Sequence, residues 1–229
     1  MAGGEEEYKK MIKILDYNKL KKKLRFVVDM DTSLANAIRR SALEIPIMAI
    51  DEVEIIKNDS ALYDEVLVHR IGLIPVKTSS AKEIKFKLKE IGPKTVYSGN
   101  IKPNIETENK IPIVILGSDQ EIELIGNARV GKGIEHIKYS PGLIFYRHNL
   151  NNEILDFVNV DENGKINYDE EEIKIKLNED QIKKIKSAKE SNEILFEIES
   201  WGQIDVKEIF LKSIDALEDN LKELIKAVK

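Results

Sequence analysis

A glycine-rich segment in the middle of the chain comes closest to a motif of known chemistry. Residues 126–133 read GNARVGKG, one residue short of the phosphate-binding pattern G-x-x-x-x-G-K-[ST]. Gly133 replaces the hydroxyl that binds Mg²⁺ in that motif, and Gly133 and Pro141 disfavour the helix that such a loop must open. We interpret the segment as a basic loop after a strand, with a nucleotide-binding protein as the alternative function.

Two further sets of residues have the types, but not the spacing, of metal sites. Residues 161–172 place Asp, Asn and Glu as a calcium loop does, but Gly falls at the fourth position and Lys165 occupies a ligand position. The three histidines, His69, His136 and His148, are not spaced as a helical metal pair. The chain has no cysteine, which excludes disulfides, thiolate zinc sites and cysteine-ligated iron–sulfur clusters. We therefore predict no catalytic residues, no metal and no cofactor.

Composition places the chain among globular proteins. Of its 229 residues, 42% are hydrophobic and 34% charged, and no apolar run approaches the ~20 residues of a bilayer span. The start, MAGGEEEYKK, lacks the apolar segment of a secretory signal, so a cytoplasmic protein is expected. A formal net charge of −5 argues against a protein that binds nucleic acid on its own, and we predict little or no direct contact with nucleic acid.

Periodicity predicts regular elements at both ends and a β-rich middle. Alternation over 24–30 after the apolar run 11–15 indicates a hairpin, and the caps at 31–33 begin a helix that Pro46 ends. Within the acidic stretch 161–192, only 173–177 looks ordered, followed by a short helix after Asn178. The other predicted elements are strands at 49–56, 84–89 (exposed or edge), 111–116, 121–125 and 194–199, and a helix at 61–70.

The C-terminal helix is the clearest element. Asp205 and Glu208 have the spacing of a capping box. The helix then carries an apolar stripe at heptad spacing: Phe210, Ile214, Leu217, Leu221, Leu224 and Val228. The first helix carries a second stripe that includes Leu34 and Ile38. One small sheet does not obviously cover both stripes, so they are either core or a surface for a partner.

Three long stretches resemble a known family. They are 32–51 (TSLANAIRRSALEIPIMAID), 64–75 (DEVLVHRIGLIP) and 128–142 (ARVGKGIEHIKYSPG). In this order and at these separations they resemble the D-type subunits of archaeal RNA polymerase, a family related to the bacterial alpha subunit and the third-largest eukaryotic subunit. With the C-terminal ESWGQ segment and its helix, the resemblance spans about 30–229.

The resemblance implies an α+β fold. A discontinuous α/β dimerisation domain, 1–46 and 190–229, would be interrupted by an inserted β-rich domain, 47–189. Many relatives hold an iron–sulfur cluster in the later part of the insertion, whereas residues 161–189 are acidic and free of cysteine here. Tyr139 also stands where the family often has Trp.

The resemblance also implies partners. The family is a non-catalytic assembly platform of DNA-directed RNA polymerase, a nucleotidyltransferase; it pairs with subunit L, recruits small subunits N and P, and docks the large catalytic subunits. The implied dimer interface comprises Leu34, Ile38, Phe210, Ile214, Leu217, Leu221 and Leu224. The implied contacts with the large subunits are Arg40, Lys132, His136, Lys138 and Tyr139. Without the resemblance to this family, we would interpret Arg39 and Arg40 as surface charges that pair with nearby residues.

Overall fold

Two compact units make up the chain in a computed structural model. One unit joins Met1–Arg40 to Ile144–Glu199, and the other joins Ser41–Leu143 to Ser200–Lys229. The residues that the structure describes are 12–78, 83–103, 105–107, 110–149, 158–160, 166–168, 170–183 and 193–228.

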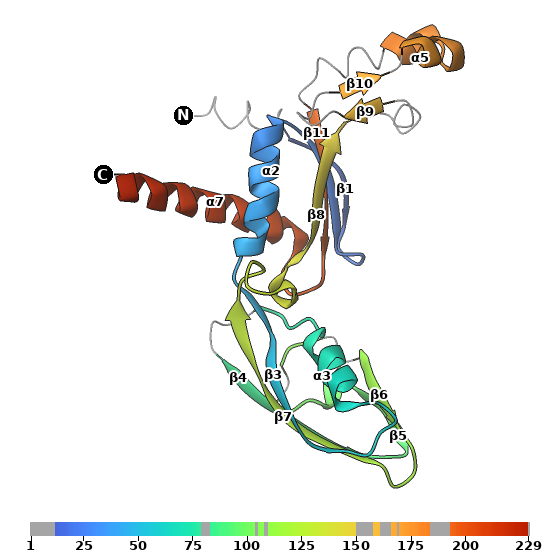
Figure 1. Ribbon diagram of the computed structural model, residues 1–229, viewed down its shortest axis with the longest axis vertical. Coiled ribbons are helices and arrows are strands. Elements are labelled where there is room, and N and C mark those ends of the chain that lie inside the picture. Colours follow the sequence, from blue (N-terminus) through green and yellow to red (C-terminus); the bar gives the residue numbers. More distant parts are fainter. Residues whose placement is uncertain are drawn as a thin grey trace. The chain divides into compact units, whose positions relative to one another are not determined.

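The first unit is built on a four-stranded sheet to which both ends of the chain contribute (Figure 1). Its strand order is β1 (Ile12–Asn18), β2 (Lys23–Asp29), β11 (Glu193–Ser200) and β8 (Gly142–His148). The strand β2 pairs antiparallel with both β1 and β11, which confirms the predicted hairpin. The strand β8 comes from the segment 47–189 that we assigned to the insertion, so this segment supplies an edge of the sheet. The division into 1–46 with 190–229 and 47–189 stays a prediction.

Alternation along β2 and β11 separates an apolar face of the sheet from a charged one. Phe26 lies opposite Phe196, and their rings stack with centroids 5.3 Å apart. On the other face, Arg25 and Arg147 approach Glu197 at 3.4 and 4.0 Å. The face that carries Phe26 and Phe196 is buried, as the period of two predicted, but Val27 and Leu195 on the other face are buried as well.

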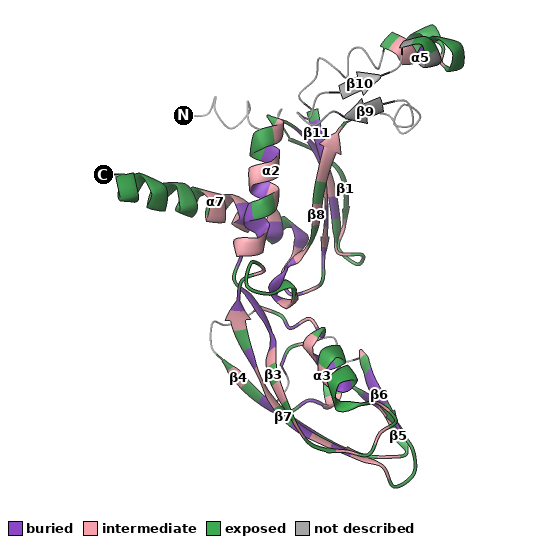
Figure 2. Cartoon of the chain, in the orientation of Figure 1, coloured by how far each residue is buried: buried purple, intermediate pink, exposed green. Residues whose placement is uncertain are grey.

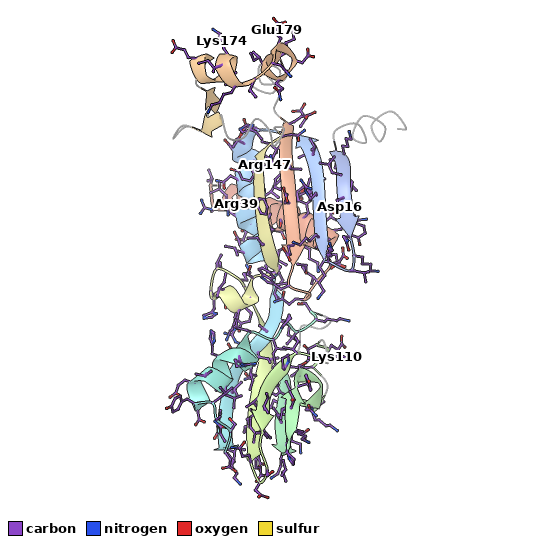
Figure 3. The ribbon with its side chains drawn as sticks, turned by 90° about the vertical axis from the view of Figure 1, so that its right-hand side faces the viewer. Asp16, Arg39, Lys110, Arg147, Lys174 and Glu179 are labelled. Carbon is purple, nitrogen blue, oxygen red and sulfur yellow. The ribbon has the colours of Figure 1, made fainter. Side chains whose placement is uncertain are left out.

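The helix α2 (Thr32–Ser41) lies against one face of this sheet (Figures 1 and 3). Asp31 caps it, because its Oδ1 accepts a hydrogen bond from the Ser33 backbone at 2.7 Å. A short 3-10 helix, η1 (Ala42–Glu44), follows and ends before Pro46, as expected. Farther along the chain, a two-stranded sheet of β9 (Val158–Val160) and β10 (Ile166–Tyr168) precedes α5 (Glu170–Lys176).

The stretch 161–189 is described only in part. Residues 173–177 belong mostly to α5, and residues 179–183 are helical after Asn178, whose Oδ1 accepts from the Gln181 backbone at 2.9 Å. This confirms the short helix predicted there. The positions 161, 163 and 165 of the calcium-like loop lie outside the described residues.

The second unit contains two sheets that pack around α3 (Asp64–Gly72). The larger sheet has the order β3 (Ile47–Asn58), β7 (Glu121–Gly131) and β4 (Ile84–Ile91); the smaller pairs β5 (Lys94–Tyr97) with β6 (Pro112–Leu116). Buried apolar side chains from both sheets and from α3 form one core. The predicted strands and helix in this region are confirmed, and β4 lies at an end of its sheet as expected, although Lys87 exchanges two backbone hydrogen bonds with Lys102.

The long helix α7 (Val206–Val228) ends the described chain. Asp205 caps it, since its Oδ1 accepts from the Lys207 backbone at 2.9 Å, while Glu208 pairs with Lys212. Within the described ranges, no helix combines the length and the apolar character that crossing a membrane requires.

Candidate functional site

One side of the helix α7 packs within the chain, and the predicted apolar stripe lies next to that side. Val206, Ile209 and Ser213 are buried, and Asn220 on the same side donates to Glu44 at 2.8 Å. At 100° per residue, the predicted stripe lies about 70° around the helix from this buried side. The predicted stripe therefore lies beside the surface of α7 that packs within the chain, and does not coincide with it.

The predicted stripe becomes more exposed toward the C-terminus (Figure 2). Phe210, Ile214 and Leu217 are half-buried, whereas Leu221 is 51% and Leu224 60% exposed. Ile225 and Val228 extend the same uncovered surface. We call Leu221, Leu224, Ile225 and Val228, which are all exposed, the α7 seam. Exposing large aliphatic side chains to water on successive turns is unfavourable, and such a surface marks an interaction site.

The helix α2 divides its predicted interface residues differently. Leu34 is exposed, but Ile38 is only 4% exposed and so has almost no side-chain surface for a partner. Ile38 lies with Ala35 on the side of the helix that this chain buries, and its place in the interface stays a prediction. Arg39 donates a hydrogen bond to Asn36 Oδ1 at 3.0 Å, so this guanidinium has a partner within its own helix. Arg40 is exposed.

A compact polar cluster surrounds Asp51 in the second unit. Asp51 is the extra residue of a β-bulge, because Ile50 pairs with Ala128 and Glu52 with Asn127. Bulges redirect side chains, and here the carboxylate meets two cations and a phenol. Its Oδ2 lies 2.5 Å from Arg129 Nε, and its Oδ1 accepts from Lys138 Nζ at 2.6 Å and from Tyr139 Oη at 2.8 Å.

The electrostatics of the cluster follow from this geometry. Burial acts to raise the pKa of Asp51, but the hydrogen bonds from Lys138, Arg129 and Tyr139 outweigh it and hold the pKa well below its usual range. Burial, followed by the hydrogen bond to Asp51, raises the pKa of the Tyr139 hydroxyl well above its ordinary value. The phenol is therefore a fixed donor and the carboxylate a fixed anion near neutral pH.

Tyr139 and Lys138 are held inside the chain. Tyr139 is 1% exposed, and an added Cβ at Gly131 would lie 2.6 Å from its ring. Lys138 Nζ is bound by Asp51, and its side chain is 17% exposed. Tyr139 and Lys138 therefore support the fold of this segment through Asp51, and their contacts with a large subunit stay predictions. Lys132 and His136 are exposed, as a contact would require.

The phosphate-binding alternative does not match this geometry. Residues 126–131 complete the strand β7, and the next helical element is the 3-10 helix η3 (Ile137–Tyr139) rather than a helix opened by the loop. Gly126 serves close packing, since an added Cβ would lie 2.6 Å from the Glu52 carbonyl oxygen. Within the described ranges, no group of three potential ligands is placed to hold a metal ion.

Sequence reasoning missed the role of Asp51 and Arg129, although both lie in the stretches that carry the resemblance. A carboxylate that interrupts the apolar start of a predicted strand, IMAIDEVEII, was the available signal. The pairing itself was not visible, because Asp51 and its partners are 78 to 88 positions apart in the chain. Ile225 was missed because it lies beside the strict heptad positions.

Comparisons with known proteins gave one matching family model and several relatives. A family model described as the RNA polymerase Rpb3/Rpb11 dimerisation domain matches residues 26–221. The DNA-directed RNA polymerase subunit Rpo3 of Halobacterium salinarum is 31% identical over 229 residues, which cover 90% of this chain and 92% of the relative.

Two other relatives match over shorter stretches and carry the same description. Subunit Rpo3 of Methanocaldococcus jannaschii is 41% identical over 139 residues, 58% of this chain and 73% of the relative. The Thermococcus kodakarensis protein is 37% identical over 142 residues, 55% of each chain. The chain thus spans only about half the length of this last relative.

Proposed function

Because the chain belongs to the RNA polymerase Rpb3/Rpb11 dimerisation domain family, we propose that it is a non-catalytic assembly subunit of a DNA-directed RNA polymerase. In this role it pairs with a small subunit of the L type. The pair recruits the small subunits N and P, docks the large catalytic subunits, and acts in the cytoplasm. The nucleotidyl transfer itself belongs to the other subunits.

The α7 seam is the observation that carries this proposal. Its aliphatic side chains are uncovered over the last turns of the helix, and obligate interfaces are rich in such surface. The half-buried Phe210, Ile214 and Leu217 continue the seam toward the part of α7 that packs within the chain. Leu34 on α2 is a further candidate for the same partner.

In the proposed architecture, segments from both ends of the chain form one discontinuous dimerisation domain. The sheet that unites β1, β2 and β11 supports this idea, because its strands come from both ends of the sequence. The β-rich part between them is the proposed inserted domain, with β8 added to the sheet. Arg40, Lys132 and His136 remain the exposed candidates for contacts with the large subunits.

No iron–sulfur cluster is part of this proposal. Such clusters are held by cysteine thiolates, and the sequence contains none. We therefore propose that residues 161–189 fulfil their role without a cluster. Elemental analysis of the freshly purified heterodimer is expected to find no stoichiometric iron.

The pairing is tested by placing charge on the seam. In the variant Leu221→Asp/Leu224→Asp, two carboxylates replace exposed leucines, so the fold of the chain is retained. Burial of each leucine by a partner contributes ~1.5–3 kcal/mol, so losing both predicts at least a ~100-fold weaker complex with the L-type subunit. Analytical ultracentrifugation of the co-expressed pair measures the affinity.

Leu211→Asp is the matched control. Leu211 is on the same helix and is 59% exposed, but it lies about 100° away from the predicted stripe. Pairing should be nearly unchanged in this variant. If the seam variant keeps its circular dichroism spectrum and still binds the partner at wild-type affinity, the proposed interface is wrong.

A further inference from the structure

A groove crosses the outer face of the sheet β3–β7–β4. It encloses about 550 Å³, and all of its lining residues belong to the second unit. Glu52 and Glu54 of β3 form one wall, while Lys85 and Lys87 of β4, with Lys102, form the other. We call these the acidic wall and the basic wall. Ile125 of β7 lies between them and is 42% exposed.

Toward one end of the sheet, the same face carries acidic residues on its central strand and lysines on both outer strands. There Lys57 and Lys89 flank Glu123 in register, and the acids of the central strand bind lysines on both sides. Lys57 lies 2.8 Å from Glu121, and Lys89 lies 2.6 Å from Glu123. Charges at this end are therefore neutralised within the chain.

In the groove the central strand is neutral. Ile125 stands between Glu54 and Lys87, and Asn127 stands between Glu52 and Lys85. Two strand spacings, ~10 Å, separate the backbones of the strands that carry the two walls. Within the described part of the chain, none of the five charged wall residues has an ion-pair partner. Opposite charges are thus held apart, with the uncharged Ile125 and Asn127 between them.

We propose that the groove binds an extended polypeptide segment of a neighbouring polymerase subunit. The segment presents a basic side chain to the acidic wall, an acidic side chain to the basic wall, and an apolar side chain to Ile125. This proposal rests on the proposed function, because it takes its partner from the same assembly. Charge complementarity identifies the occupant, since each wall lacks a counter-charge that this segment supplies.

Nucleic acid fits the groove poorly. A phosphate backbone that binds Lys85 and Lys87 would run about 10 Å from two carboxylates, whose repulsion opposes it. The floor also lacks an exposed aromatic ring on which a base stacks, because Phe86 is 4% exposed. A segment with both charge signs meets neither penalty.

Zero-length carbodiimide cross-linking of the native polymerase tests this proposal, because the reagent joins only a carboxylate and an amine already in contact. The polymerase is purified through a tagged copy of this chain. Glu54 is expected to link to a lysine, and Lys87 to a carboxylate, within one short segment of one neighbouring subunit. Neither link should form in the isolated heterodimer with the L-type subunit.

The variant Glu54→Lys/Lys87→Glu inverts the groove while leaving net charge unchanged. Both side chains are exposed, so the fold should persist, but incorporation into polymerase should fall at least about tenfold in competition with wild type. The matched control, Glu65→Lys/Lys77→Glu, inverts two exposed charges outside the groove and should retain its cross-links at Glu54 and Lys87.

Three results would overturn the proposal. Assembled polymerase could yield no link from either wall, the two walls could link to different chains, or the inverted variant could assemble like wild type. If instead the tagged chain brings down no polymerase, the proposed function fails together with this inference. A polymerase that contains the chain but no groove cross-links refutes the groove alone.

Discussion

The α7 seam and the Asp51 cluster reverse the usual distribution of apolar and charged side chains. The seam consists of aliphatic side chains that the chain leaves uncovered, with Leu224 at 60% exposure. The cluster consists of charged side chains that the chain satisfies, with a carboxylate bound by Arg129, Lys138 and Tyr139. Apolar surface is stable in water only when covered, whereas a closed set of ion pairs and hydrogen bonds needs no partner.

This difference distinguishes residues that are available to bind a partner from residues that stabilise the fold of the chain. Charged residues in the stretch 128–142 invite the interpretation of a docking surface, but the structure uses two of the predicted contacts, Lys138 and Tyr139, to hold the chain together. The exposed Lys132 and His136 remain available on the same loop. A motif thus contains both the residues that make a contact and the residues that fix the loop carrying it.

The largest effect on partner binding is expected along this stripe of α7, and the accompanying loss of stability should differ between its positions. Leu224→Asp should weaken pairing with the L-type subunit at least ~10-fold while leaving the free energy of unfolding unchanged, because Leu224 is already exposed. Leu217→Asp should weaken pairing similarly and also destabilise the isolated chain, because Leu217 is half-buried. Urea denaturation of each variant alone, followed by a binding titration, separates the two losses.

The opposite result would be informative. If Leu224→Asp destabilises the isolated chain as strongly as Leu217→Asp does, the end of α7 packs within the chain. The seam would then be core, which was the second interpretation that periodicity allowed.

Periodicity predicted the elements well because backbone geometry is local. The hairpin β1–β2, the helix α2 before Pro46, and the caps at Asp31 and Asp205 follow from spacing and from cap chemistry. Register is not local. A one-residue bulge places Asp51 in its cluster, and neither propensity nor alternation encodes that extra residue.

The stripes show the same limit. Heptad spacing found the apolar positions of α7 but not which side of the helix packs within the chain. That choice depends on the neighbouring η1, through contacts such as Asn220 with Glu44 across 176 positions of sequence. The same limit applies to Ile38, because an apolar stripe has the same sequence pattern whether it packs on a sheet of its own chain or on a partner.

Breaking the Asp51 cluster should produce the largest loss of stability in the isolated chain. Asp51→Asn leaves Lys138 without its counter-charge at a largely buried position, and we expect a loss of about 2–3 kcal/mol in the free energy of unfolding. Chemical denaturation at neutral pH measures it. Glu121→Gln is the control, because its partners Lys57 and Lys89 keep other carboxylates and are solvent-exposed. If both variants lose the same stability, the Asp51 cluster contributes no more than an exposed ion pair does.

The close packing beneath the cluster predicts a smaller loss. Gly131→Ala places a Cβ 2.6 Å from the Tyr139 ring, so the ring must shift, at a cost of about 1–3 kcal/mol. Gly72→Ala is the matched control: no atom lies within 4 Å of its added Cβ, and Ala favours a helix. Thermal unfolding should show a lower Tm for the first variant and an equal or higher Tm for the second. A Gly131→Ala variant as stable as wild type would mean that Tyr139 has room to move.

The smallest effect is a pH dependence that belongs to Asp51 alone. The folded pKa of this carboxyl is depressed below its ordinary value of 3.8, so the stability it contributes is fully present above pH 3.8 and is lost as pH falls toward the folded pKa. Between pH 5 and pH 3 the unfolded chain takes up a proton at this position and the folded chain does not. Wild type should therefore lose about 1 kcal/mol more than Asp51→Asn over this interval.

The difference between the two proteins is the quantity to measure, because other carboxyls contribute to acid unfolding as well. Asp31 and Glu121 also have lowered pKa values, and both titrate identically in wild type and in Asp51→Asn. Urea denaturation at pH 5, 4 and 3 gives the two stability curves, which should converge toward acid. Parallel curves would show that Asp51 takes up its proton equally in the folded and unfolded chains, so that Arg129, Lys138 and Tyr139 do not stabilise its charge.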